Sequence, residues 1–320
     1  FDHLIVATGA THHYFGNDEW EETAPGLKTL PDATRLRAMI LEAFEDAERT
    51  GNADLTFLVV GGGPTGVEMA GAIAEMANHT LRRDFRAIDP GAARVLLVEA
   101  GDRILSTYPQ TLSLKATAQL EALGAEVRTG WAVTDLAPGT ATLRSSEETT
   151  ELPTAATVWA AGVKASPLGE ALVPLGAELD RVGRVRVKPD LSIPGHPNIY
   201  VAGDLAALEQ GGSPVPGVAP AAIQMGRYVA DRIRGRTTRD FRYRDKGSLA
   251  TIGRSAGIAD FGRIRFSGLP AWMAWLGIHL LFLIGFQNRL LVMIQWAWSY
   301  ITRNRSARLI VRYEDGERLP

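Results

Sequence analysis

The stretch LTFLVVGGGPTGVE, residues 55–68, decides the fold of this 320-residue chain. Its continuous apolar start is typical of a strand buried in a parallel sheet. The strand leads into a G-x-G-x-x-G pattern, in which the first glycine permits a tight turn, the second lets backbone approach a pyrophosphate, and the third lets the helix pack on the strand. The phosphates would then lie at the positive end of the following helix. The predicted phosphate-binding residues are Gly61, Gly62, Gly63, Pro64, Thr65 and Gly66.

Further apolar strands lie on the C-terminal side of this turn, and helical segments separate several of them. The expected strands are 94–99, 125–130, 157–162 and 199–204. This alternation favours doubly wound parallel sheets. A chain of 320 residues is long enough to form two such domains.

Composition excludes several classes of function. The chain contains no cysteine, which excludes disulfide chemistry, thiolate metal sites and cysteine nucleophiles. The net charge of −2 gives no reason to expect nucleic acid as a partner. His12 and His13 are adjacent and lack the spacing of metal ligands, so we predict no metal site.

Glu99 ends the second strand, where an acidic residue binds the adenosine ribose hydroxyls and repels a 2′-phosphate. It follows Gly66 by 33 residues, whereas the usual spacing is about 20. The helix and the loop 78–94 account for the excess. A solvated glutamate at a strand end is the alternative interpretation. The position favours NADH over NADPH.

Six stretches together resemble the type II NADH:quinone oxidoreductases, which are single-subunit NADH dehydrogenases that do not pump protons. In chain order they are THHYFGNDEWEETAPGLKTL, TFLVVGGGPTGVEMAGAIAE, VLLVEAGDRIL, TVWAAGV, NIYVAGDLA and KGSLATIG. The resemblance implies an α/β fold with two doubly wound, Rossmann-like dinucleotide-binding domains, the NADH domain being inserted in the FAD domain. It also implies a C-terminal amphipathic helical segment that binds the membrane, and the cofactors FAD and NADH.

The resemblance also divides the chain. The implied parts are 1–25 (end of the first FAD-domain segment), 26–163 (NADH domain), 164–245 (second FAD-domain segment) and 246–320 (membrane-associated region). FDHLIVATGA, residues 1–10, resembles the strand that closes the first FAD-domain segment. We therefore expect the opening βαβ of the FAD domain to lie upstream, in a longer enzyme.

The resemblance also implies which residues bind the two cofactors. Implied for FAD are Thr8, Gly9, Gly203, Asp204 and Ala222, and for the passage of NADH, Ala161 and Gly162. Alternative interpretations are a helix cap for Asp204 and a plain tight turn for the Thr8–Gly9 pair.

Three residues are implied in the chemistry: Glu68, Gln224 and Lys246. In the family, the glutamate faces nicotinamide and flavin, the glutamine lines the quinone tunnel, and the lysine lies near the flavin. Glu68 would also complement a helix dipole, and Lys246 is alternatively an exposed loop charge. Met225 stands where a second glutamine is common, which weakens any model with paired glutamines.

The implied reaction is hydride transfer from NADH to FAD, followed by transfer of two electrons to a membrane quinone. Disulfide and sulfide:quinone reductases need cysteines, which this chain lacks. The remaining alternatives are a ferredoxin or rubredoxin reductase and a low-turnover, nucleotide-sensing flavoprotein.

The C-terminal stretch 269–308 has the character of a membrane-surface segment. Its apolar runs, 269–286 and 290–301, are 18 and 12 residues long, below the about 20 needed for a span. The segment holds four of the seven tryptophans, and between Phe261 and Tyr313 there are seven arginines and no acidic residue. We expect it to lie on an anionic leaflet near the quinone.

We therefore expect a peripheral membrane enzyme. Its resemblance to the type II NADH:quinone oxidoreductases implies the cytoplasmic face of the bacterial cell membrane. The alternative is a helical hairpin that closes a core or a homodimer interface.

Overall fold

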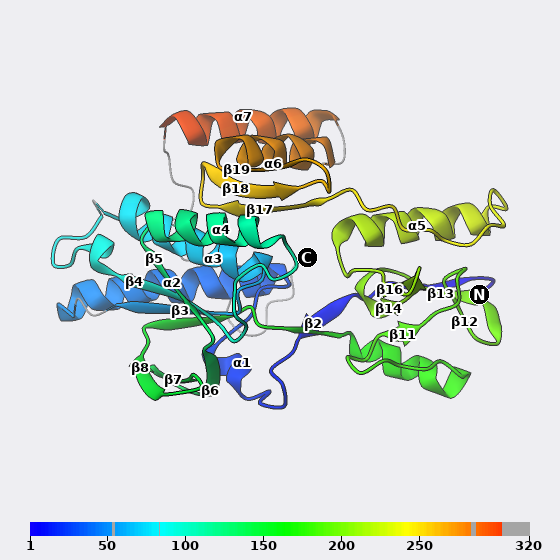
Figure 1. The fold of residues 1–320 in the computed structure, drawn as a ribbon, viewed down its shortest axis with the longest axis horizontal. Helices are drawn as coiled ribbons and strands as arrows, with labels where there is room; N and C mark the ends of the chain where they lie inside the picture. Colours follow the sequence, from blue (N-terminus) through cyan, green and yellow to red (C-terminus); the bar gives the residue numbers. More distant parts are fainter. Residues whose placement is uncertain (53–54, 83, 283–285, 303–320) are drawn as a thin grey trace. The chain divides into compact units, whose positions relative to one another are not determined.

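The computed structural model of the chain describes residues 1–52, 55–82, 84–282 and 286–302 (Figure 1). The chain forms two compact units, each built from two segments that are distant in the sequence. The small unit comprises Phe1–His13 and Gly162–Lys246, and the large unit comprises Tyr14–Ala161 and Gly247–Pro320.

A four-stranded parallel sheet forms the centre of the large unit. Its strand order is β5 (Ala125–Thr129), β4 (Arg94–Glu99), β3 (Thr56–Val60) and β9 (Ala156–Trp159). Helix α3 (Pro64–Glu75) contacts β3 and β4, α4 (Gln110–Ala122) contacts β5, and α2 (Leu30–Thr50) contacts β9. The predicted doubly wound parallel sheet is therefore confirmed.

Both faces of this sheet are buried, as its apolar strands require. Successive side chains of β3 alternate between two cores because side chains of a strand point to opposite faces. Phe57 and Val59 belong to the core that includes α2, α3 and α4, whereas Leu58 and Val60 belong to a second core. The second core contains Trp159 of β9 and residues of an antiparallel ribbon.

The antiparallel ribbon consists of β6 (Ala132–Ala137), β7 (Thr140–Arg144) and β8 (Thr149–Pro153). The short helix α1 (Trp20–Thr23) contributes Trp20, whose ring lies edge-on to that of Trp159 at 5.6 Å. The ribbon and α1 thus cover one face of the parallel sheet.

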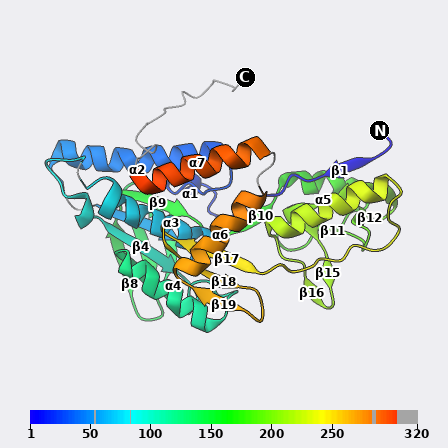
Figure 2. The same ribbon diagram turned by 90° about the horizontal axis from the view of Figure 1, so that it is seen from above.

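A second, antiparallel sheet follows in the C-terminal part of the large unit. It consists of β17 (Ser248–Ile252), β18 (Ala256–Asp260) and β19 (Arg265–Ser267). This sheet packs on α3 and α4, and α6 (Leu269–Phe282) lies across it, as Figures 1 and 2 show. Helix α7 (Phe286–Thr302) contacts α6. Ile252 and Ile258 are buried in the same core as α3.

The small unit joins the start of the chain to its later segments. Strand β1 (Leu4–Val6) pairs in parallel with β13 (His196–Val201), which pairs with β12 (Ser192–Ile193), and β2 (Ala10–His12) pairs with β10 (Val163–Ala165). Helix α5 (Ala219–Ile233) follows. The remaining strands are β11 (Val185–Arg186), β14 (Ala206–Ala207), β15 (Glu209–Gln210) and β16 (Ser213–Pro214). The stretch 1–10 is thus a partner of the strand expected at 199–204.

Candidate functional site

The glycine turn between β3 and α3 is a close-packed structure. Gly61 has a φ of 106°, and a Cβ added there would lie 2.6 Å from the backbone of Ala160 and Ala161. A Cβ at Gly66 would fall directly on the carbonyl oxygen of Gly61. Around Gly63, the first residue before α3, the space is open among the described residues. The turn therefore bends tightly at Gly61, packs α3 closely on β3 at Gly66, and leaves space at Gly63 for a pyrophosphate to approach the backbone.

Glu99, at the end of β4, lies directly beside this turn. Its Oε2 accepts a hydrogen bond from the backbone N–H of Gly62 at 2.6 Å, and its Oε1 accepts one from Gly101 at 2.7 Å. Hydrogen bonds to a charged acceptor are short and strong. The carboxylate is thus held next to the phosphate turn, at the carboxyl ends of the parallel strands where dinucleotides bind.

Glu68 lies in the second turn of α3, and its carboxyl group is directed toward the C-terminal sheet. The backbone N–H of Thr251 on β17 donates to Glu68 Oε1 at 3.3 Å. Burial raises the pKa of the Glu68 carboxyl, and the hydrogen bonds from Thr251 and the charge of His279 oppose that rise only in part. A carboxyl with a raised pKa in a buried position is able to exchange a proton nearer to neutral pH.

The two small residues after β9 fall in different units. Ala161 ends the first segment of the large unit, where its Cα would be 2.6 Å from a Cβ at Gly61. Gly162 begins the second segment of the small unit, where its carbonyl oxygen accepts from the N–H of His13 at 3.1 Å. A larger side chain at Ala161 would narrow the approach to the glycine turn.

In the small unit, the residues predicted for FAD gather where β13 meets the start of α5. Gly203 has a φ of 76°, and a Cβ there would lie 3.5 Å from the Cβ of Ala222. Its N–H donates to the sulfur of Met225 at 3.3 Å. Asp204 lies next to Gly217, in the loop that leads into α5. Small residues and a carboxylate therefore converge on one helix start.

The Thr8–Gly9 turn follows β1 at the same end of the parallel pair at which Gly203 follows β13, since the N–H of Ala202 donates to the carbonyl oxygen of Val6 at 3.1 Å. This turn is tied to the segment after β10. Gly9 has a φ of 70°, and its carbonyl oxygen accepts from the N–H of Ser166 at 3.0 Å. The positive φ is a conformation that glycine adopts at little cost.

Gln224 on α5 has both ends of its amide bound to one backbone position. Its Nε2 donates to the carbonyl oxygen of Arg244 and its Oε1 accepts from the N–H of Arg244, each at 3.0 Å. Arg244 is two residues before Lys246. No local sequence pattern indicates this pair of hydrogen bonds, because the two residues are 20 positions apart.

The predictions for chemistry thus fall in two places. Glu68 belongs to the large unit, and Gln224 and Lys246 belong to the small unit. Among the described residues, no group of three or more His, Cys, Asp or Glu side chains is placed to hold a metal ion.

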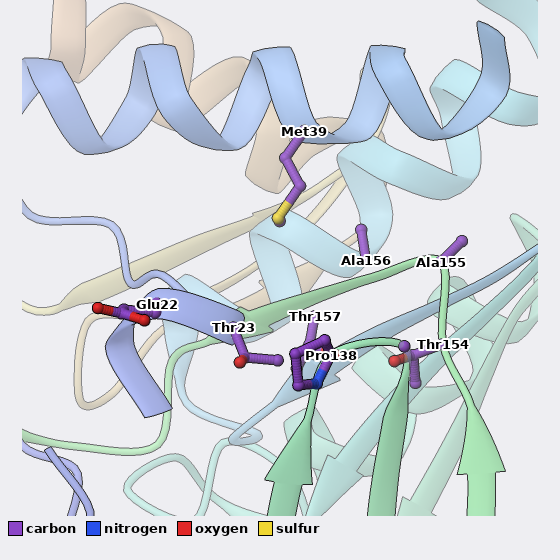
Figure 3. Close-up of a pocket in the computed structure, with 9 residues that line it drawn as sticks. Glu22, Thr23, Met39, Pro138, Thr154, Ala155, Ala156 and Thr157 are labelled. Atoms are coloured by element: carbon purple, nitrogen blue, oxygen red, sulfur yellow. The ribbon is translucent and has the colours of Figure 1, made fainter. Parts of the chain in front are cut away.

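A pocket of about 350 Å³ lies at the amino end of β9, whereas the glycine turn follows the carboxyl end of β3. Figure 3 shows Met39 extending from α2 on one side, with Thr23, Pro138 and Thr154 on the other. Thr157, near the start of β9, also lines it, and its buried Oγ1 has no hydrogen-bond partner among the described residues. The described lining residues include none of those predicted for cofactors or chemistry.

Helices α6 and α7 expose a series of apolar side chains. Among these, Met273 is 60% exposed and Leu281 is 69% exposed on α6, and Ile294 is 58% exposed on α7. The rings of Trp275 and Trp296 stack at 6.0 Å and join the two helices. Within the described residues, no helix is long and apolar enough to cross a membrane.

Part of the predicted basic character of this segment lies outside the described residues, namely Arg303, Arg305, Arg308 and Arg312. Arg263, Arg265 and Arg289 are described. Arg265 forms an ion pair with Asp260 at 3.2 Å.

The chain was compared with known protein families. It matches the pyridine nucleotide-disulphide oxidoreductase family over residues 1–226 and the NDH2 C-terminal domain over residues 246–304. It is 46% identical to the type II NADH:quinone oxidoreductase Ndh of Mycobacterium tuberculosis, over 95% of this chain and 68% of that protein. It is 43% identical to NdhA of the same organism, over 97% of this chain and 68% of that protein.

Among solved structures, the chain is similar to NDH2 from Plasmodium falciparum in complex with NADH. The TM-score is 0.85 at 19% sequence identity, and the match covers 98% of this chain and 79% of that one. At this level of identity the likeness concerns the fold.

Proposed function

The chain belongs to the family of type II NADH:quinone oxidoreductases, and from this premise we propose how its residues share the reaction. The protein is an oxidoreductase that uses NADH and FAD to reduce a quinone, without pumping protons. When bound, FAD supplies the group that accepts the hydride of NADH and passes the electrons to the quinone.

The glycine turn and Glu99 bind NADH in this proposal. The observation that carries it is the pair of short hydrogen bonds that holds the Glu99 carboxylate beside Gly62, next to the open space at Gly63. The N–H groups at the start of α3 bind the pyrophosphate, and the Glu99 carboxylate accepts from the adenosine ribose. Ala161 packs its backbone against Gly61, and its small side chain is the feature that we assign to the passage of NADH.

The convergence at the start of α5 suits FAD. Gly203 and Ala222 keep the approach to the helix free of bulky side chains, and Asp204 offers a carboxylate to sugar hydroxyls. Within the described residues, no side chain caps the N-terminus of α5, so an anion bound there would face the positive end of the helix dipole. Thr8 and Gly9 complete the set of small residues that we assign to this cofactor.

We assign the remaining chemistry to Glu68, with Gln224 and Lys246 in supporting roles. Glu68 is the group able to hold a proton, because burial raises the pKa of its carboxyl. Gln224 holds the backbone at Arg244 and so fixes the segment that carries Lys246. Glu68 lies within residues 26–163, which we assign to the NADH domain.

The exposed apolar faces of α6 and α7 bind the membrane in this proposal. Their side chains would enter the lipid boundary, and the nearby arginines favour an anionic, cytoplasmic leaflet. The same apolar faces would alternatively close a homodimer, which is the second candidate for this surface.

Steady-state kinetics test the proposed function. We expect the FAD-containing holoenzyme to oxidise NADH rapidly with a water-soluble quinone as acceptor. Turnover with oxidised ferredoxin as the electron acceptor in place of the quinone would favour the ferredoxin reductase alternative. Binding of NADH without turnover on any quinone would favour the nucleotide-sensing alternative and contradict the proposal.

A further inference from the structure

The contact between Glu68 and Thr251 joins two segments that are 183 residues apart in the sequence. The backbone N–H of Thr251 donates to Glu68 Oε1 at 3.3 Å, and the side-chain hydroxyl of Thr251 acts with it to lower the pKa of the same carboxyl group. Strand β17, which carries Thr251, pairs with β18 through Thr251 and Gly257. The donor is therefore part of a sheet rather than of a free loop.

Two further contacts keep β17 and the turn after it in place along α3. A Cβ at Gly71 would lie 3.0 Å from the backbone nitrogen of Gly253, and Glu75 forms an ion pair with Arg254 at 3.3 Å. Glu68, Gly71 and Glu75 are spaced by three and four residues, so they lie on one face of the helix. Docking along this whole face prevents Thr251 from sliding relative to Glu68.

We propose that Thr251 is a positioning residue for Glu68, which it holds by hydroxyl and N–H in the orientation for proton exchange during quinone reduction. The inference rests on the proposed role of Glu68 as the group that holds a proton. It adds that the C-terminal sheet is a working part of the site, because it carries the donor that orients this carboxyl group.

The electrostatic surroundings of Glu68 give the inference a measurable consequence. His279 of α6 and Tyr108, which follows β4, both interact with its charge, and Asp260 of β18 acts in turn on Tyr108. The hydrogen bonds from Thr251 lower the pKa of Glu68 against the effect of burial. Loss of the hydroxyl must therefore raise the pKa of this carboxyl further, since the charged form loses a donor.

The sign of the resulting change does not depend on which protonation state is active. If Glu68 acts when protonated, activity falls as pH rises through its pKa, and if it acts when ionised, activity rises there. In both cases the limb of the pH profile that Glu68 controls moves to higher pH when the hydroxyl is removed.

The experiment is a pH profile of quinone reduction by the FAD-containing holoenzyme. Thr251→Val removes the hydroxyl with little change of volume, and we expect it to move the limb upward by about half a pH unit or more. Thr251→Ser keeps the hydroxyl and should restore the wild-type profile. Thr150→Val, on strand β8, is the matched control and should leave the profile unchanged. Reduction of the flavin by NADH is measured separately, in single turnover, so that an effect on this step is distinguished from an effect on quinone reduction.

Glu68→Gln separates this inference from the role on which it rests. If that variant abolishes the limb while Thr251→Val leaves it in place, Thr251 is not a positioning residue and Glu68 keeps its role. If the limb persists in Glu68→Gln, or is missing in the wild type, both the role of Glu68 and the inference are wrong. If Thr251→Val does not retain FAD, the pH profile is measured on Thr251→Ala instead, which also lacks the hydroxyl.

Discussion

Replacement of Glu99 by glutamine should change the choice between NADH and NADPH. The carboxylate is fixed by Gly62 and Gly101 at 2.6 and 2.7 Å, and glutamine keeps an oxygen for one of these donors while it removes the charge. A 2′-phosphate carries a charge of about −1.5 to −2. At roughly 5 Å and an effective dielectric constant of about 40, its repulsion by a carboxylate amounts to about 2 to 3 kcal/mol.

Removal of this repulsion corresponds to a gain of about 30- to 150-fold in kcat/KM for NADPH. NADH loses one charge-assisted hydrogen bond to its ribose and with it about 1 kcal/mol, or roughly fivefold. The ratio of the two kcat/KM values should therefore shift toward NADPH by about 100-fold or more.

The assay is steady-state turnover with each nucleotide and a water-soluble quinone. Glu147→Gln, in the exposed turn between β7 and β8, removes the same charge away from the turn and serves as the control. A ratio that stays within threefold of the wild-type value in Glu99→Gln would refute the assignment of Glu99 as the ribose acid.

Three further predictions concern the turn, the acid stability of the small unit and the membrane surface. Gly66→Ala should weaken NADH binding by about tenfold or more in a fluorescence titration, because its Cβ would fall on the carbonyl oxygen of Gly61. Burial raises the pKa of Asp190, but the hydrogen bonds from Ser192 and the charges of Lys188 and Arg232 together lower it by more, so the pKa lies below its ordinary value. Asp190→Asn should therefore cost stability above the unfolded pKa of about 3.9 and cost little below the folded pKa, as urea unfolding at several pH values would show. Leu281→Glu should reduce pelleting with anionic liposomes, whereas unchanged pelleting with a lost dimer in gel filtration would favour the homodimer.

Local patterns were sufficient to predict the glycine turn and the parallel sheet. The glycine spacing after β3 and the apolar run of β4 each act within a few residues, and they determine the strand–turn–helix unit directly. Boundaries were less accurate. Apolar residues recur at helical spacing only from 33 to 49, whereas the helix extends over Leu30–Thr50, since a capping box between Thr29 and Asp32 starts it earlier.

Contacts between distant segments could not be predicted in the same way. Nothing in the local pattern of KGSLATIG indicates that Thr251 donates to Glu68, because the hydrogen bond depends on how the C-terminal sheet docks on α3. The pair of hydrogen bonds between Gln224 and Arg244 has the same origin. The roles of Glu68 and Gln224 in the chemistry stay predictions, and the tertiary structure supplies the groups that hold these two side chains.

The most direct test of the account is an anaerobic single-turnover experiment on the FAD-containing holoenzyme bound to anionic liposomes. NADH is added first, and the flavin absorbance near 450 nm is followed until it is constant. A long-chain quinone in the same bilayer is then added. The proposed function requires that NADH bleaches the flavin band and that the quinone restores it within a catalytic turnover. A band that NADH does not bleach, or that stays bleached after addition of the quinone, would contradict it.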